Sequence, residues 1–349
     1  MTLEVKPSVV FNTHYRLEKV QCYANGSFSL NVKRLADGKK ELLLFDGNGH
    51  LSLAPQKAKL GVILYNSSFI LFGKDAKNNF KNNQVVYKGI IPMGEVYNSR
   101  GEVIASGFEN FKIFSNGWYM LEYREHKELY SADSRLQAKD FVDCEVLENG
   151  YYALRTDSKL YKNGCYEVYT LGAKKIATIK DVHQFMSSNL ALQKTDTEGV
   201  YTLINFKGEE IVTKVIGYQK FLNQKFSLTF KNGSSAMYDD KGNRLSTFTG
   251  PNAKFLPDNT FIIYRQKMVD TRYRSNGLMI KREIFRCEEM SNYFLLTTEF
   301  KTELYNDKGE VIDENILIAS LLDNFVLLQK EDKYHLYNQF GKVLEFDVI

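Results

Sequence analysis

The chain has 349 residues and a formal net charge of +4, and 44% of its residues are hydrophobic while 25% are charged. This composition is ordinary for a folded protein and excludes a low-complexity or collagen-like chain. The charge is mild and disfavours a nucleic-acid-binding protein, for which a concentrated basic face is expected. No run of 18 apolar residues occurs, so no membrane-spanning helix is predicted.

The first predicted element is an N-terminal segment, residues 1–24, that precedes the repeats. It contains an apolar stretch at 9–11 and a stretch of mixed apolar and charged residues at 15–20. Its beginning lacks the charged and then apolar pattern of a secretory signal, which predicts a cytoplasmic protein. We expect this segment to supply a closing β-strand.

From residue 25 onwards the chain repeats one unit, with a mean spacing of about 37 residues. Each repeat begins near an asparagine that precedes a short strand rich in aromatic and branched residues. A fixed period of this length is typical of repeat architectures, so residues 1–349 are predicted to form a single β-repeat domain. The nine asparagines are Asn25, Asn66, Asn116, Asn149, Asn189, Asn223, Asn259, Asn292 and Asn324.

The second strand of each repeat leads into a turn closed by glycine or a substitute, as in Asn306-Asp307-Lys308-Gly309. Asn and Asp bond their own backbone and Gly accepts a positive φ, so this pattern predicts a tight hairpin. Positive φ is expected at Gly242 and Gly309 in particular. The nine turn ends are Gly49, Gly101, Ser134, Gly172, Gly208, Gly242, Gly277, Gly309 and Gly341.

The distance from each turn end to the next asparagine is either 15 or 17 residues. Side chains of a strand alternate between two faces, so a difference of two residues keeps every side chain on its own face. The parity therefore indicates β structure, with four short antiparallel strands per repeat.

These patterns predict an all-β repeat protein, a β-propeller-like ring of about nine four-stranded units. Only eight residues follow Gly341, so residues 1–24 would supply the strand that the last repeat lacks. Closure of this kind hides the sheet edges that an open array exposes. A β-solenoid or an open β-superhelix is the alternative.

No motif of a catalytic, metal or cofactor site occurs in the sequence. The five histidines are dispersed, the four cysteines form no CxxC pair, and no glycine-rich phosphate loop or nucleophile elbow is present. We therefore predict no cofactor and no metal, and the absence of motifs favours a non-catalytic protein without excluding an enzyme. Carboxylates gathered from distant repeats are the arrangement that a single sequence does not reveal.

Two surface features stand out as candidate sites. The first is a polar and basic insertion in the second repeat, for which Lys74, Lys77, Phe80 and Lys81 are the predicted partner-binding residues. The second is a weaker basic patch in the seventh repeat, formed by Arg265, Lys267, Arg272 and Arg274. Solvated loop residues and scattered charges are the competing interpretations.

Residues 325–344 resemble a WG repeat, a bacterial family that reads as an apolar strand, a polar turn, a second strand and an Asp/Asn-x-x-Gly turn. The resemblance extends over nearly the whole chain, although the namesake Trp-Gly pair is missing and Trp118 is the only tryptophan. It implies a β-repeat scaffold without associated catalytic residues.

The predicted function is a non-catalytic interaction scaffold that binds a protein or another macromolecule through variable loops on one face. The alternative is a carbohydrate-binding or carbohydrate-active propeller that uses Tyr and Phe rings for stacking. A protein partner is expected, a glycan is the second candidate ligand, and nucleic acid is disfavoured.

Overall fold

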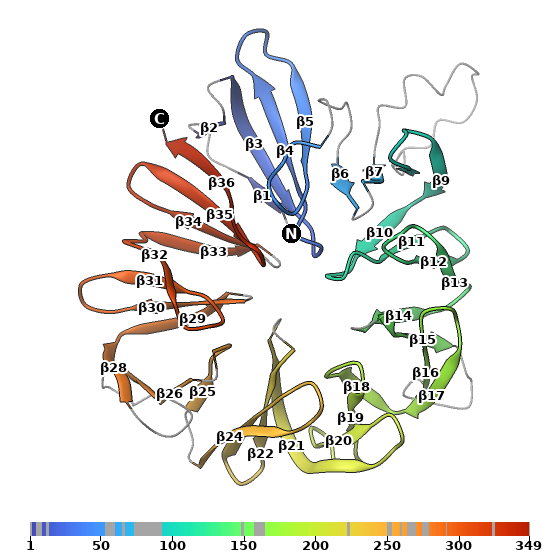
Figure 1. The fold of residues 1–349 in the computed structure, drawn as a ribbon, viewed down its shortest axis with the longest axis vertical. Coiled ribbons are helices and arrows are strands. Elements are labelled where there is room, and N and C mark those ends of the chain that lie inside the picture. Colours follow the sequence, from blue (N-terminus) through green and yellow to red (C-terminus); the bar gives the residue numbers. More distant parts are fainter. Residues whose placement is uncertain are drawn as a thin grey trace. The chain divides into compact units, whose positions relative to one another are not determined.

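A computed structural model of the chain contains only β-strands as regular elements in the residues it describes, with no α-helix among them (Figure 1). The chain divides into two compact units, one formed by Met1–Asp140 with Leu317–Ile349 and the other by Phe141–Ile316. The described residues are 2–4, 9–11, 14–52, 60–64, 67–72, 93–147, 150–156, 165–221, 224–249, 253–258, 260–263, 270–273, 279–290, 292–322 and 325–348.

The largest sheet of the first unit joins the two ends of the chain. Its order is β33-β34-β35-β36-β2-β3-β4-β5, with β1 beside β3. Val9 of β2 is paired with Val348 of β36, so the N-terminal segment continues the sheet that the C-terminal strand begins. The strands are β1 (Thr2–Glu4), β2 (Val9–Phe11), β3 (Tyr15–Cys22), β4 (Phe28–Arg34), β5 (Lys40–Phe45), β33 (Ile318–Leu322), β34 (Phe325–Gln329), β35 (Lys333–Asn338) and β36 (Gly341–Val348).

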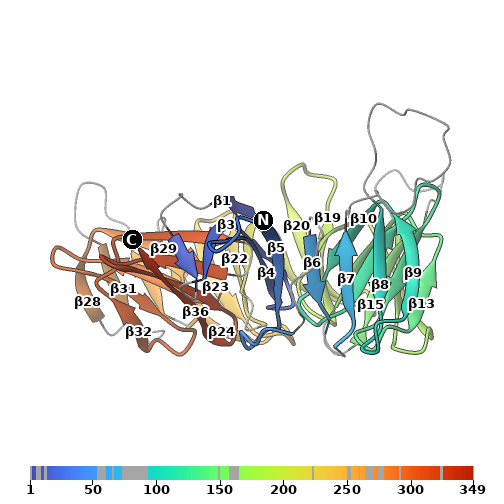
Figure 2. The ribbon, with the colours of Figure 1, turned by 90° about the horizontal axis from the view of Figure 1, so that it is seen from above.

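Two four-stranded antiparallel sheets complete the first unit. Figure 2 shows the strands of one of them, β6 to β9, standing side by side. The first sheet comprises β6 (Leu60–Ile63), β7 (Phe69–Phe72), β8 (Gly94–Tyr97) and β9 (Val103–Phe108). The second comprises β10 (Asn110–Ile113), β11 (Tyr119–Glu122), β12 (Lys127–Tyr130) and β13 (Leu136–Lys139).

The second unit has three four-stranded sheets and one seven-stranded sheet. The first four-stranded sheet comprises β14 (Asp143–Val146), β15 (Tyr152–Thr156), β16 (Cys165–Tyr169) and β17 (Lys175–Lys180). The second comprises β25 (Ala253–Phe255), β26 (Phe261–Ile263), β27 (Asp270–Tyr273) and β28 (Met279–Ile284). The third comprises β29 (Arg286–Met290), β30 (Tyr293–Thr297), β31 (Thr302–Tyr305) and β32 (Val311–Glu314).

The seven-stranded sheet joins two repeats because one strand belongs to both. The 11-residue strand β21 pairs with β20 on one side and with β22 on the other. Its strands are β18 (Val182–Phe185), β19 (Leu190–Lys194), β20 (Tyr201–Asn205), β21 (Glu210–Lys220), β22 (Phe226–Phe230), β23 (Ser234–Tyr238) and β24 (Arg244–Thr249). Together these sheets confirm the predicted fold class, an all-β repeat protein of four-stranded propeller-type units.

The turns that end in glycine have the predicted hydrogen bonds and backbone conformation. In the turn after β31, the Asn306 amide N–H donates to the Glu310 carbonyl over 3.0 Å, and the Asn306 Oδ1 accepts from the Glu310 N–H over 2.9 Å. Gly309 has a φ of 83° and Gly242 a φ of 86°, which confirms the expectation for both positions. Ser134 has a φ of 63° at the corresponding position, in a region that favours glycine.

The turns that carry the repeat asparagine join the first strand of a sheet to the second. In the turn before β4, the Asn25 Oδ1 accepts from the Ser27 amide over 3.2 Å and from the Ser27 hydroxyl over 2.8 Å. The intervening Gly26 has a φ of 87°. In a four-stranded sheet the strand before this turn is the first in the order, as β10 is before Asn116.

In two repeats the turn before the second strand is bonded by a side chain other than asparagine. Before β26, the Asp258 carboxylate accepts from the Thr260 amide over 3.1 Å, while the predicted anchor Asn259 lies outside the described residues. Before β19, the Ser187 hydroxyl accepts from the Asn189 amide over 3.2 Å, so Ser187 takes the role expected of Asn189. Asn, Asp and Ser all bond nearby backbone, which is why they exchange here.

Stacked aromatic rings link the second strand to the third in six of the repeats. Their ring centroids lie 4.8 to 5.6 Å apart across directly paired positions. Such cross-strand pairs stabilise a sheet, which accounts for the aromatic residue that begins the second strand and the tyrosine that ends the third. The pairs are Phe28–Phe45, Phe69–Tyr97, Tyr119–Tyr130, Tyr152–Tyr169, Phe226–Tyr238 and Phe294–Tyr305.

Within each of the two large sheets, neighbouring repeats are hydrogen-bonded to each other through their turns. Asn338 is completely buried, and its Nδ2 donates to the Gly26 carbonyl over 3.0 Å and to the Gly47 carbonyl over 2.6 Å. In the second unit, the Ser187 hydroxyl donates to the Asp240 carbonyl over 2.7 Å. These bonds satisfy buried turn carbonyls that the sheet ladders do not reach.

Candidate interaction surfaces

The predicted partner-binding residues of the insertion, Lys74, Lys77, Phe80 and Lys81, lie outside the described residues. The same is true of Arg265, Lys267 and Arg274 in the predicted basic patch. Arg272 is the one residue of the two predicted sites whose surroundings the structure describes.

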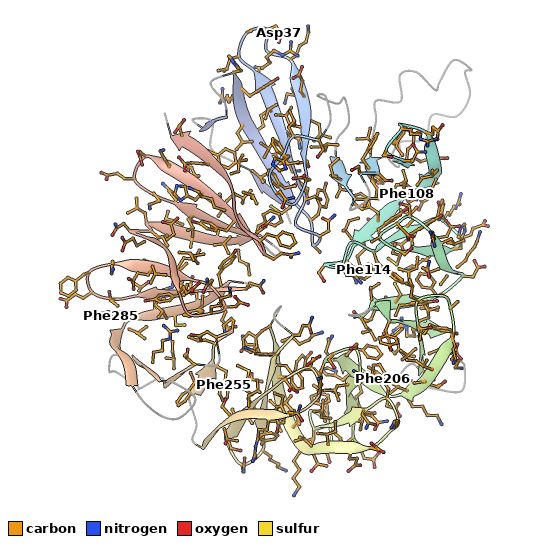
Figure 3. The ribbon with its side chains drawn as sticks, in the orientation of Figure 1. Asp37, Phe108, Phe114, Phe206, Phe255 and Phe285 are labelled. Atoms are coloured by element: carbon orange, nitrogen blue, oxygen red, sulfur yellow. The ribbon has the colours of Figure 1, made fainter. Side chains whose placement is uncertain are left out.

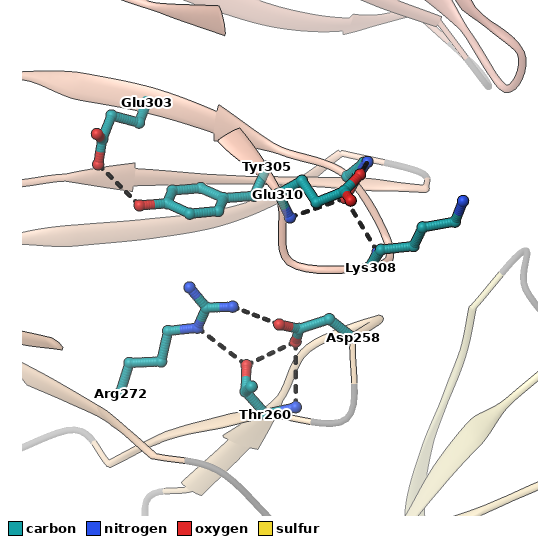
Figure 4. A network of polar contacts seen from close by, with 8 residues as sticks. Asp258, Thr260, Arg272, Glu303, Tyr305, Lys308 and Glu310 are labelled. Atoms are coloured by element: carbon teal, nitrogen blue, oxygen red, sulfur yellow. Dashed lines mark hydrogen bonds and ion pairs between the residues drawn. The ribbon is translucent and has the colours of Figure 1, made fainter. Parts of the chain in front are cut away.

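Arg272 is a core residue and makes no surface patch. Its side chain and that of Asp258 are each only 4% exposed and form an ion pair. The Arg272 Nε also donates to the Thr260 hydroxyl over 3.0 Å (Figure 4). Its guanidinium carbon lies 4.8 Å from the ring centroid of Phe294 and 5.0 Å from that of Tyr305. The sequence revealed the charge of Arg272 but not its partner, which sits at the position assigned to an asparagine turn.

Glu128 in the first unit lies among several titratable side chains. Its carboxylate accepts from the Tyr130 hydroxyl over 2.7 Å and lies 3.1 Å from His126 Nε2 and 3.3 Å from Lys139 Nζ. Burial acts to raise the pKa of Glu128, but the bonds from Tyr130, His126 and Lys139 outweigh it and lower that pKa. A carboxylate that these bonds hold ionised does not serve as a general acid.

No group of three or more His, Cys, Asp and Glu side chains suited to a metal ion occurs in the described part of the chain. Within those same residues, no helix is long and apolar enough to cross a membrane.

Strand β33 presents an apolar edge. It pairs with β34 and has no other partner among the described strands. Leu317, which precedes it, and Ile318 and Leu321 within it are 64%, 56% and 42% exposed. The segment Ile318–Leu322 reads IASLL and contains no charged residue.

Several other first strands differ in this respect because they contain charged residues. Lys112 lies in β10, Asp143 and Glu145 in β14, and Arg286 and Glu288 in β29. Charged side chains are a common means of protecting a sheet edge against pairing with another chain.

Strands β6 and β18 also lack charge, but Val62 and Ile63 in β6 and Val182 and Phe185 in β18 are buried. Strand β33 therefore combines an uncharged sequence, exposed branched side chains and an open backbone edge.

The loops between second and third strands were predicted to form the binding face. The first of them, after β4, extends the β4–β5 hairpin, with Asp37 at its tip (Figure 3). The Asp37 Oδ2 lies 3.6 Å from the Arg34 Nη1 and 2.9 Å from the Lys39 Nζ. The neighbouring Leu35 is exposed. The long loops of the second and fourth repeats, at 73–92 and 157–164, lie outside the described residues.

The sheets define a β-repeat protein of the propeller type. No protein-family model matches the chain, and no curated protein matches it. Similar solved structures include BamB from Moraxella catarrhalis, with 9% identity, a TM-score of 0.34, and coverage of 73% of this chain and 91% of that one. Hsv2p from Kluyveromyces lactis has 9% identity and a TM-score of 0.36, with 69% and 96% covered. The Dos1 propeller has 9% identity and a TM-score of 0.34, with 88% and 94% covered.

Proposed function

We propose that the protein is a non-catalytic interaction scaffold that binds a protein partner by strand addition to β33. The observation that carries this proposal is the open, uncharged edge of β33 with its exposed Leu317, Ile318 and Leu321. An extended peptide that lies along such an edge bonds to its free backbone groups, while alternate side chains meet the apolar surface.

The chemistry of the partner follows from that edge. The segment that binds is extended, is free of proline at its bonding positions, and carries branched or aromatic residues opposite Ile318 and Leu321. The loop face with Lys74, Lys77, Phe80 and Lys81 is a proposed second contact for the same partner. We also propose a relation to WG-repeat proteins and a cytoplasmic location, on the sequence patterns alone.

The test is to place a lysine on the edge. Ile318→Lys and Leu321→Lys change exposed side chains, so the fold is expected to survive, while strand addition is blocked by a desolvated charge. Val103→Lys is the matched control, because Val103 is 52% exposed on the fourth strand of another sheet in the same unit.

Partners captured by the wild-type chain and by Val103→Lys should bind at least about tenfold more weakly to the two β33 variants, a loss of about 1.4 kcal/mol. Amide hydrogen exchange of β33 should slow in the complex. Partners retained at unchanged affinity by both β33 variants, with unchanged exchange of β33, would refute the proposal.

A further inference from the structure

Three aromatic rings come together on the seven-stranded sheet of the second unit. They are His183 on β18, Tyr201 on β20 and Tyr218 on β21. The imidazole is stacked on the Tyr201 ring, with centroids 4.2 Å apart and an interplanar angle of 17°. It meets the Tyr218 ring edge-on, with centroids 5.6 Å apart. His183 is exposed and Tyr218 is 38% exposed, so the group opens to solvent.

The polar atoms of this group have no partner among the described residues. The imidazole nitrogens of His183 and the hydroxyls of Tyr201 and Tyr218 make no hydrogen bond to any residue that the structure describes. Other tyrosines of the repeat differ, since the hydroxyls of Tyr130 and Tyr169 donate to glutamates over 2.7 and 2.6 Å.

A second stacked His–Tyr pair differs because its histidine is hydrogen-bonded within the protein. The rings of Tyr123 and His126 lie 4.5 Å apart, but His126 Nε2 is 3.1 Å from Glu128. The bonding capacity of that pair is therefore used within the protein. The capacity of the His183 group remains available to a ligand.

The charges around the rings are mixed. Lys194 is directly paired with Tyr201 across β19 and β20. Burial lowers the pKa of His183, and the positive charge of Lys194 lowers it further by a smaller amount. Asp181 lies two residues before His183, and the hairpin after Lys194 carries Asp196 and Glu198. A polyanion would meet these carboxylates, whereas hydroxyl groups can both donate and accept at such a surface.

We propose that His183, Tyr201 and Tyr218, with Lys194 beside them, form a binding site for the ring of a neutral sugar. The apolar face of the sugar lies on the exposed aromatic surface, and its hydroxyls bond to the imidazole, the phenol oxygens and the lysine ammonium. This inference goes beyond the proposed protein-binding function and depends on a different unit, so the two can fail separately.

The experiment is a titration of the full chain with hexasaccharides of glucose, N-acetylglucosamine, mannose and galactose, followed by calorimetry and by the NMR signals of the His183 ring. A 15-nucleotide oligo(dT) tests the polyanion class. At least one hexasaccharide should bind saturably and shift the His183 signals. His183→Ala and Tyr218→Ala should each weaken binding at least about tenfold.

His126→Ala is the matched control, because it removes a stacked histidine whose bonds are closed, and it should leave sugar binding unchanged. Melting curves of all variants establish that they are folded. The proposal is overturned if no hexasaccharide binds at 10 mM, which is about the weakest affinity a stacked and hydrogen-bonded sugar would have. It is also overturned if binding survives His183→Ala and Tyr218→Ala, or if only the oligonucleotide binds.

Discussion

Replacing Asp258 by asparagine should destabilise the second unit far more than loss of a surface charge would. The Asp258 carboxylate accepts from the Thr260 amide and faces Arg272, and both charged side chains are 4% exposed. In Asp258→Asn the amide oxygen can still bond to Thr260, but the Nδ2 hydrogens then point toward the guanidinium donors. Arg272 is left as a buried charge without its counter-ion.

Breaking a buried ion pair by removal of one partner costs about 3–5 kcal/mol. Arg272→Met should cost somewhat less, because Asp258 keeps its bonds to Thr260 and the methionine still packs beside the rings of Phe294 and Tyr305. The double variant should cost less than the sum of the single changes, with a coupling energy of at least about 2 kcal/mol, because neither charge is then stranded.

Urea unfolding of the four proteins supplies the free energies, with the slope m checked for constancy. Arg286→Met is the control, because Arg286 pairs with Glu288 while 71% exposed, and such a pair contributes about 0–1 kcal/mol. The reasoning is refuted if Asp258→Asn costs no more than Arg286→Met, or if the two buried changes are additive.

Other outcomes follow from single contacts. Gly309→Ala should cost at least about 1 kcal/mol more in urea than Gly101→Ala, because both have positive φ but only at Gly309 would the new Cβ lie 2.6 Å from the Asp258 carboxylate; equal costs would exclude the clash. Asn338→Ala should destabilise the first unit by about 2–3 kcal/mol, since two turn carbonyls lose their donor, and a melting temperature like that of wild type would contradict this. The pKa of Glu345 is lowered from 4.5 to about 2 by Lys333 and Lys342, so its contribution to stability is present above pH 4.5 and is lost as the pH falls toward 2; the difference in melting temperature from Glu345→Gln should shrink over that range, and a constant difference would argue against the pairing. Deletion of residues 1–24 should expose the edge of β36 and promote association, which light scattering would detect, and a monomer of unchanged stability would count against it.

Turn chemistry was the most readable feature of this sequence. Gly242 and Gly309 have the expected positive φ because the Asn/Asp-x-x-Gly pattern specifies its own backbone bonds within five residues. The apolar strands could also be predicted from short stretches of sequence, because their aromatic residues pair directly with those of the next strand along the chain. The all-β class rests on such short-range signals.

The anchor asparagines were only partly correct. When Asn189 and Asn259 are taken as anchors, the distances from turn end to anchor differ between repeats by an even number of residues. Ser187 and Asp258, however, hold the turn positions equivalent to that of Asn25. The parity was therefore weaker support for strands than it seemed, because three different side chains serve the same turn. The fate of Arg272 depended on Asp258, 14 residues earlier in the chain, and no local pattern signals that pairing. The β33 edge was likewise hidden, since exposure depends on which strands find partners.

The bond from Asn338 to Gly26 spans 312 residues of chain. Closing a loop of that length costs about 5 kcal/mol of chain entropy beyond a constant, so contacts of this kind form late in folding. Until then both β2 and β36 present open edges, and the earlier sheets must fold without them. The slow step for this protein is therefore expected to be the docking of its two ends, and the time spent before it is when a newly made chain is most exposed to aggregation and most in need of a chaperone.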